Sequence, residues 1–267
     1  MNAILRRSLP GLALLALAAC ARDNAPTAAV DSASDLVASV AVDPALAAEP
    51  GQASLVGITM EPATTFAGEL SAATACTYSP TSKRVECPPV TRNGLTYTRS
   101  IAYYDGAGVA QPKRDDKTRA TNTRIDVKGN VTTPKGTLAV VRSSDLTVSG
   151  LGRASTTHTM NGLETGRTSG TLATDKGAAA MREESSSKTE NVVVPVPAKA
   201  GSWPLSGSTT RSGSTTATRV ATNETRSSSW SEKVTYTGTS VVNVEITRDG
   251  KTKTCTRDLA TRKTTCK

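Results

Sequence analysis

The sequence predicts an all-β protein whose long antiparallel strands form a meander, either a curved open sheet or a half-barrel. Three observations support this: apolar and polar residues alternate, threonine and serine fill most other strand positions, and turn signals recur at short intervals. Between the turns, the body of the chain shows no convincing amphipathic helix. A two-sheet β-sandwich is the alternative architecture.

Two segments show the alternation most clearly. In residues 123–131, Ile125, Val127 and Val131 fall on one face and charged or amide side chains on the other. In residues 241–248, Val242, Val244 and Ile246 are expected to point inward. The pattern predicts roughly a dozen strands. Several, such as 138–149 and 206–219, are longer than the usual five or six residues.

Turns are expected where glycine, proline, asparagine and aspartate cluster, because these residues adopt the backbone angles that tight turns need. The expected turns are Asp105-Gly106, Pro134-Lys135-Gly136, Gly150-Leu151-Gly152, Asn161-Gly162, Asp175-Lys176-Gly177, Thr237-Gly238 and Asp249-Gly250.

The predicted core is thin, since the 267 residues include one Phe, two Trp and five Tyr. Large aromatic side chains usually dominate core burial. Here valine, leucine, isoleucine, alanine and the threonine methyl groups must replace them. Trp203 is expected to cap the core where a strand begins near residue 205.

The first twenty residues, MNAILRRSLPGLALLALAAC, have the features of an export signal: Arg6 and Arg7 precede an apolar run from Leu9 to Ala19. The run is too short to span a bilayer, which needs about twenty apolar residues. Its end, Leu17-Ala18-Ala19-Cys20, resembles the lipobox of bacterial lipoprotein signal peptides.

This resemblance implies cleavage before Cys20, a diacylglyceryl thioether on its sulfur, and a fatty acyl chain such as palmitate on the new amino group. Several acyl chains together anchor a protein stably without spanning the membrane. In that family, aspartate after the cysteine commonly retains the protein in the inner membrane, so Ala21 favours the outer membrane. An ordinary secretory signal is the alternative interpretation.

The chain is therefore divided into a signal peptide at 1–19, a flexible acidic tether at 20–50 and an antiparallel β domain at 51–267. Residues 20–61 hold six acids and one base, a net charge of −5. The mature chain has 30 bases against 23 acids, so the remaining residues hold 29 bases against 17 acids, or +12. Three prolines and many alanines in the acidic stretch indicate a flexible segment.

Four cysteines remain after Cys20, and export places them where disulfides persist. The segments 76–87 and 255–266 have the same length, and each begins and ends with cysteine. Each is expected to form a hairpin, whose opposed residues lie within disulfide reach. We therefore expect Cys76 to pair with Cys87 and Cys255 with Cys266. Ten intervening residues and one histidine argue against a zinc site, and no Cys-x-x-Cys motif is present.

No catalytic or metal-binding residue is predicted, no cofactor is implied, and the chain is not expected to be an enzyme. His158, the only histidine, lies in a threonine-rich strand and is expected to be exposed. The acidic pairs Asp115-Asp116 and Glu183-Glu184 lie among basic residues, as on a solvated surface.

The expected partner is the membrane, through the anchor at Cys20. The basic surplus makes anionic envelope polymers such as lipopolysaccharide a candidate second partner, although it is also explained by solubility and protection of strand edges. Specific nucleic-acid binding is not expected, because stacking aromatics are scarce. The oligomeric state stays open.

The first functional hypothesis is a membrane-anchored envelope lipoprotein, in the outer membrane, with a non-enzymatic structural or interaction role. The alternative is a periplasmic carrier or binding protein for a lipid or another amphiphile, with the concave side of the sheet as its pocket. Against a carrier stands the shortage of large apolar residues, since ligand pockets are mostly apolar and aromatic.

Overall fold

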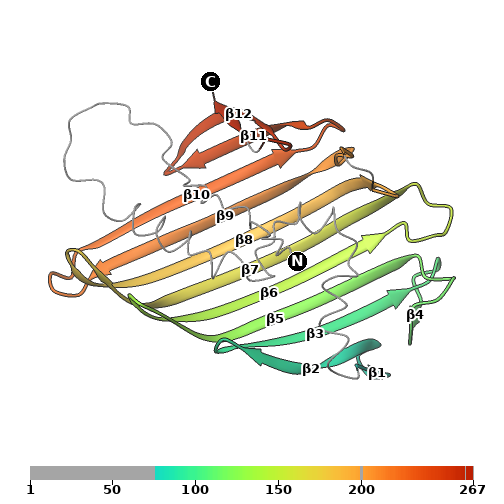
Figure 1. Ribbon diagram of the computed structural model, residues 1–267, viewed down its shortest axis with the longest axis horizontal. Helices are drawn as coiled ribbons and strands as arrows, with labels where there is room; N and C mark the ends of the chain where they lie inside the picture. Colours follow the sequence, from blue (N-terminus) through green and yellow to red (C-terminus); the bar gives the residue numbers. More distant parts are fainter. Residues whose placement is uncertain (1–75, 199–200, 262, 267) are drawn as a thin grey trace, which may run out of the picture.

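The computed structural model describes residues 76–198, 201–261 and 263–266 (Figure 1). The predicted signal peptide 1–19, the tether 20–50, residues 51–75 of the predicted β domain, and Cys20 lie outside these residues. The described residues form thirteen strands and no helix. The strands are β1 (Thr77–Ser79), β2 (Arg84–Arg92), β3 (Leu95–Tyr104), β4 (Ala110–Gln111), β5 (Ala120–Thr133), β6 (Gly136–Ser149), β7 (Thr157–Thr174), β8 (Gly177–Pro195), β9 (Ser206–Arg219), β10 (Thr225–Thr235), β11 (Val241–Arg248), β12 (Lys251–Asp258) and β13 (Thr264–Cys266).

All thirteen strands belong to one open antiparallel sheet, whose order follows the chain from β1 to β13. The single exception is the short β4, which pairs with the end of β3 beside the main path. The predicted long-stranded meander in an open curved sheet is therefore confirmed, and the alternative two-sheet sandwich is not what forms. The longest strands, β7 and β8, contain 18 and 19 residues.

The two edge strands, β1 and β13, are each three residues long and each is tied to its neighbour by a disulfide. Cys76, next to β1, is bonded to Cys87 in β2, and Cys255 in β12 is bonded to Cys266 in β13. These are the two pairs expected from the sequence. Exposed strand edges invite pairing with other chains, and short edge strands limit that pairing. The disulfides hold these short strands at the two ends of the sheet.

The register defines two faces of the sheet, because opposed residues of an antiparallel pair point to the same side. We call the side that holds Val127, Val140, Met181 and Val244 the core face. We call the side that holds Arg124, Arg182 and Thr216 the polar face. Successive pairings carry each assignment across the sheet from β2 to β12.

The strand residues of the three apolar clusters lie on the core face. The largest cluster joins β7 and β8 to β10, β11 and β12, and it includes Val242 and Val244, which are almost completely buried. A second cluster, on β3, β5 and β6, contains Ile125, Val127 and Val131, the predicted inward residues of that segment. The third joins Leu138, Leu172 and Met181. The alternation therefore predicted correctly which side of these strands is buried.

Most predicted turns join strands where expected, but Asn161-Gly162 does not form a turn. Both residues lie inside β7, opposite Thr147 and Leu146 of β6. A Cβ atom at Gly162 would approach the Leu146 side chain within 3.0 Å. Asn161 instead accepts a hydrogen bond from the backbone N–H of Asn191, where β8 bulges. Here glycine provides room for a neighbouring side chain rather than a change of chain direction.

Candidate functional site

The two faces of the sheet differ sharply in charge. Among the strand residues other than Arg92, the core face carries nine basic and three acidic residues, a net charge of +6. The polar face carries seven basic and seven acidic residues, a net charge of 0. The core-face bases are Arg99, Arg142, Arg211, Arg219, Arg226, Arg248, Lys251, Lys253 and Arg257, and its acids are Glu164, Glu183 and Glu232. The polar-face bases are Arg84, Arg124, Lys128, Arg167, Arg182, Lys188 and Lys233, and its acids are Glu86, Asp126, Asp145, Glu184, Glu190, Glu245 and Asp258.

Three of the four exposed bases on the core-face strands gather at the β11–β12 hairpin, and the fourth, Arg226, lies on β10. Arg248 and Lys251 are directly opposed across the Asp249-Gly250 turn, and Lys253 follows on the same face. All three side chains are exposed. Among the described residues, no acidic group lies within salt-bridge distance of any of them. We call these three residues the basic corner.

Trp230 lies beside the basic corner, because it pairs with Arg248 across β10 and β11. Its indole lies over Gly213 of β9, where an added Cβ atom would come within 2.9 Å of the ring nitrogen. A glycine at this position lets the ring lie flat on the neighbouring strand. The half-buried indole is therefore directed toward β9, on the side of β10 away from the basic corner.

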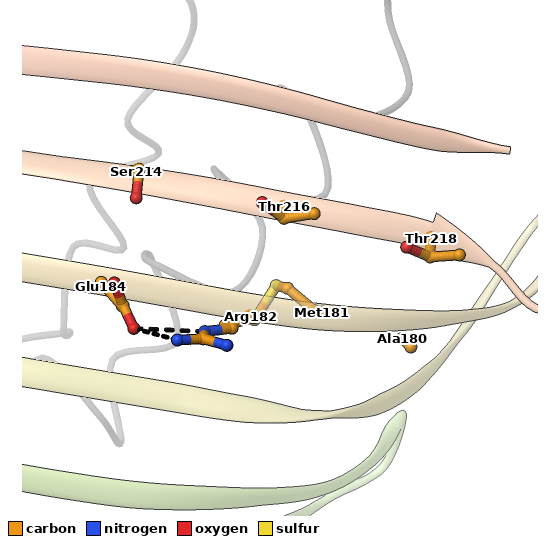
Figure 2. A pocket seen from close by; sticks show the side chains of 7 residues that line it. All are labelled: Ala180, Met181, Arg182, Glu184, Ser214, Thr216 and Thr218. Carbon is orange, nitrogen blue, oxygen red and sulfur yellow. Dashed lines mark hydrogen bonds and ion pairs between the residues drawn. The ribbon is translucent and has the colours of Figure 1, made fainter.

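The polar face is hollowed over β8 and β9. A shallow depression of about 450 Å³ is lined by Ala180, Met181, Arg182, Glu184, Ser214, Thr216 and Thr218 (Figure 2). Arg182 and Glu184 form an ion pair at its centre, with the hydroxyl groups of β9 alongside. The hydrogen bond from Arg182, together with its charge, lowers the pKa of Glu184. Five of its seven lining residues have hydrogen-bonding side chains.

A second depression of about 300 Å³ adjoins the first, and Glu184 lines both. Its other lining residues are Val141, Ser143, Thr165 and Arg167 of the polar face, and Arg142, Gly166 and Ser185, which the register places on the core face. Lipid and amphiphile sites are lined mainly by apolar and aromatic side chains. Neither hollow has an aromatic lining residue, and most of the lining residues of each carry polar side chains. The strand residues of the apolar clusters are packed on the core face.

A buried polar network on the polar face joins β2, β3, β5 and β6. Arg84, only 8% exposed, donates to the Ser100 hydroxyl at 2.7 Å and to the Asn122 side-chain oxygen at 2.8 Å. It also donates to the backbone carbonyls of both residues. Asn122 in turn donates to Asp145, which forms an ion pair with Arg124. Burial, followed by the charge of Arg124, lowers the pKa of Arg84.

Asp145 is the carboxylate of this network. Burial acts to raise its pKa, but hydrogen bonds from Asn122 and Arg124 and the charges of Arg124 and Arg84 outweigh burial, so the pKa is lowered. A lowered pKa means that the ionised form stabilises the fold. This contribution is complete above the pKa of the unfolded chain and is lost as the pH falls through the lower folded-state value. Through Arg84 and Asn122 the network ties β2 to β3, β5 and β6.

The candidate acidic pairs are not brought together as acid and base. Glu183 lies on the core face and Glu184 on the polar face, because neighbouring strand residues point to opposite sides. Asp116 forms an exposed ion pair with Arg153. Asp115 accepts hydrogen bonds from the Lys117 backbone and from Gln111, and these lower its pKa. Asp115 thus has partners in β4 and in the loop before β5, and Asp116 has one in the loop after β6.

The expectation that His158 is exposed was wrong. It is half-buried on the core face, opposite Val194 of β8. Burial, followed by the charge of Arg114, lowers its pKa. Trp203, expected to cap the core, is half-buried just before β9 and is followed by the buried Pro204.

The described residues contain no group of three or more His, Cys, Asp or Glu side chains placed to hold a metal ion. Within the same residues, no helix has the length and apolar character needed to cross a membrane. Comparison of the chain with protein-family models, with curated proteins and with solved structures gave no match.

Proposed function

We propose that this protein is a lipid-anchored envelope protein, without enzymatic activity, whose β domain binds anionic envelope polymers through the core face of its sheet. The observation that carries the proposal is the charge difference between the faces, +6 on the core face and 0 on the polar face. Solubility alone would require no such segregation. A surface of one charge sign attracts a polymer of the opposite sign and raises its rate of association.

The basic corner is the part of the core face best placed for this contact. Its three cations are exposed, and among the described residues no acidic group lies within salt-bridge distance of them. Arg248 acts on the neighbouring Asp249 only through its charge, which contributes to lowering the pKa of Asp249. Cationic side chains close to an anionic lipid surface each contribute about 1 kcal/mol to binding. Three of them therefore supply about 3 kcal/mol, or roughly a hundredfold in affinity, at low ionic strength.

A matched pair of variants tests the surface. Replacing Arg248, Lys251 and Lys253 with glutamine is expected to weaken binding of the β domain to purified lipopolysaccharide by roughly a hundredfold at low salt. The control replaces Arg167, Lys128 and Lys233 with glutamine. These are also one arginine and two lysines, are also exposed, and lie on the polar face.

The two variants have the same net charge and differ only in the face from which three positive charges were removed. Titration calorimetry at several salt concentrations measures the result. Normal binding by the control variant together with loss of binding by the corner variant supports the proposal. An equal loss of affinity in both variants would show that only net charge matters, and would contradict binding through the core face.

The anchor is supported by the resemblance of Leu17-Ala18-Ala19-Cys20 to the lipobox, which implies attachment at Cys20. Intact-mass spectrometry of protein extracted from cell envelopes is expected to show a chain that begins at Cys20 and carries acyl groups. A chain with an unmodified Cys20 in the soluble fraction would contradict the anchor and would leave the surface proposal to be tested separately.

The carrier hypothesis has less support. Its pocket would need a groove lined by apolar side chains, whereas the depressions of the polar face are lined mostly by Ser, Thr, Arg and Glu. The apolar side chains of the core face lie in clusters whose central members are buried. Lipid that copurifies with the β domain after removal of the anchor would reverse this ranking.

A further inference from the structure

The described chain supplies no second layer to cover the core face of the sheet. All strands within residues 76–198, 201–261 and 263–266 belong to the same sheet, and these residues contain no helix. A sheet with one apolar face normally packs that face against another layer. The core face holds the strand residues of all three apolar clusters, so it is the face that a further part of the chain would cover.

The basic corner adjoins an apolar side chain on this face. Ile246 lies two positions before Arg248 on β11 and pairs with Lys253 of β12, so all three point to the core face. Ile246 is half-buried and packs against the largest apolar cluster. The corner therefore suits a segment that is both acidic and apolar.

The chain itself contains a segment of that composition. Residues 20–61, which lie outside the described residues, have a net charge of −5. Asp35 and Asp43 directly flank the mostly apolar run LVASVAV at 36–42, and Asp31 precedes it. The core face has a net charge of +6 and the polar face a net charge of 0. Charge complementarity therefore favours contact of this segment with the core face.

The segment is long enough to reach the basic corner. Nine successive pairings lead straight across the core face from Val90 of β2 to Lys251 of β12. Neighbouring strands lie about 4.8 Å apart, so this path is about 43 Å long. It starts close to Cys87, which is bonded to Cys76, the first described residue. The residues between Asp43 and Cys76 can extend to about 100 Å, more than twice that distance.

We propose that residues 20–61 fold back onto the core face of the same chain, where Asp31, Asp35 and Asp43 pair with the basic corner when no polymer is bound. Each such pair is exposed to water and contributes little alone. Linkage within one chain compensates, because it holds the acids at an effective concentration of about millimolar. The segment then competes with an anionic polymer for the same cations. The docking does not depend on the proposed function, whereas this competition rests on it.

Zero-length cross-linking of the whole lipoprotein, purified in an uncharged detergent, tests the docking. A carbodiimide joins a carboxylate to an amine only where the two are in contact. Cross-links are expected from residues 20–61 to Lys251 and Lys253, and they should be lost at about 1 M salt, where charges are screened beyond about 3 Å. The absence of such cross-links, or cross-links to Lys128 and Lys233 of the polar face instead, would overturn the proposal.

The same experiment on an equal mixture of ¹⁵N-labelled and unlabelled protein identifies the chain that supplies the segment. Cross-links within labelled chains and within unlabelled chains support docking inside one molecule. Cross-links that join a labelled chain to an unlabelled one would show that a second copy occupies the corner, and would overturn docking within the chain.

An aspartate variant tests whether charge drives the docking. Asp31→Asn/Asp35→Asn/Asp43→Asn is expected to raise the rate of amine labelling at Lys251 and Lys253 about tenfold, the factor that three weak exposed ion pairs together would give. The lysines of the polar face should be labelled at the wild-type rate. Unchanged rates at Lys251 and Lys253 would contradict docking by charge.

The matched control is Ser32→Asn/Ser34→Asn/Ser39→Asn. It introduces as many asparagines into the same segment but keeps all six acids, so its lysines should be labelled like those of the wild type. A faster rate at the basic corner in this control as well would show that the change of sequence, and not the loss of charge, releases the segment.

Binding of lipopolysaccharide separates this inference from the proposed function. The aspartate variant should bind it more tightly than the wild type, because the internal competitor is weakened. If neither protein binds lipopolysaccharide, the proposed function fails, while the cross-links and the labelling rates still establish the docking. Equal affinities of the two proteins would overturn the competition. In intact envelopes, protection of Lys251 and Lys253 in the aspartate variant would come from the polymer rather than from residues 20–61.

Discussion

Replacing Arg84 with methionine is expected to lower the free energy of unfolding by about 3 kcal/mol. Methionine keeps much of the side-chain volume but removes the four hydrogen bonds to Ser100 and Asn122. The acceptor groups left behind are largely buried, and each unsatisfied buried acceptor costs about 1–3 kcal/mol. Equilibrium urea denaturation measures the change.

Arg124→Met is the matched control for this prediction. Arg124 lies on the same face and pairs with Asp145 in the same network, but its side chain is 57% exposed. An exposed ion pair contributes at most about 1 kcal/mol, because water screens it. If both variants lose the same stability, burial of Arg84 is not the source of its effect.

Removal of either disulfide is expected to be the other large effect. Each bond closes a loop with a sequence separation of 11 residues, and a loop of that size corresponds to about 3 kcal/mol in the chain-entropy account. Loss of the bond also frees a three-residue edge strand from its neighbour. We therefore expect Cys76→Ala/Cys87→Ala and Cys255→Ala/Cys266→Ala to unfold at lower urea concentration and to self-associate, as sedimentation velocity would show.

The two disulfides should differ in their effect. Cys255 is 2% exposed and belongs to the largest apolar cluster, whereas Cys76 and Cys87 are half-buried. Removing the sulfur of Cys255 therefore also leaves a space in the core, and the Cys255/Cys266 variant should be the less stable of the two. Wild-type stability and a monomeric state in both variants would contradict the role assigned to the edge strands.

The fold could be predicted well because its signals are local. Alternation in residues 123–131 and 241–248 identifies the buried side without knowledge of any partner strand. The cysteine hairpins are likewise local, since both members of each pair lie within one hairpin. Asn93-Gly94, not used in the prediction, is a further local signal. Both residues have positive φ, as a two-residue hairpin turn between β2 and β3 requires.

The sites could not be predicted in the same way, because they depend on register across many strands. Arg84 is one of two adjacent basic residues, and nothing local distinguishes it from the exposed Lys83. Its burial results from Ser100 and Asn122 on the next strands. The bulge in β8 between Glu190 and Val193 likewise shifts the alternation along that strand, so that Val192 and Val194 lie on the core face together with Thr189. A one-residue error in register would assign those side chains to the wrong face.

Lysine labelling of the protein in its own cell envelopes tests the central claim most directly. An amine-specific reagent is applied to intact envelopes and to the purified β domain, and the rates at single lysines are compared by mass spectrometry. Lys251 and Lys253 should be labelled more slowly in the envelope, and Lys128 and Lys233 at similar rates in both samples. At about 1 M salt, where charges are screened beyond about 3 Å, the protection should disappear. Equal rates for Lys251 and Lys253 in both samples, or protection confined to Lys128 and Lys233, would contradict binding through the core face.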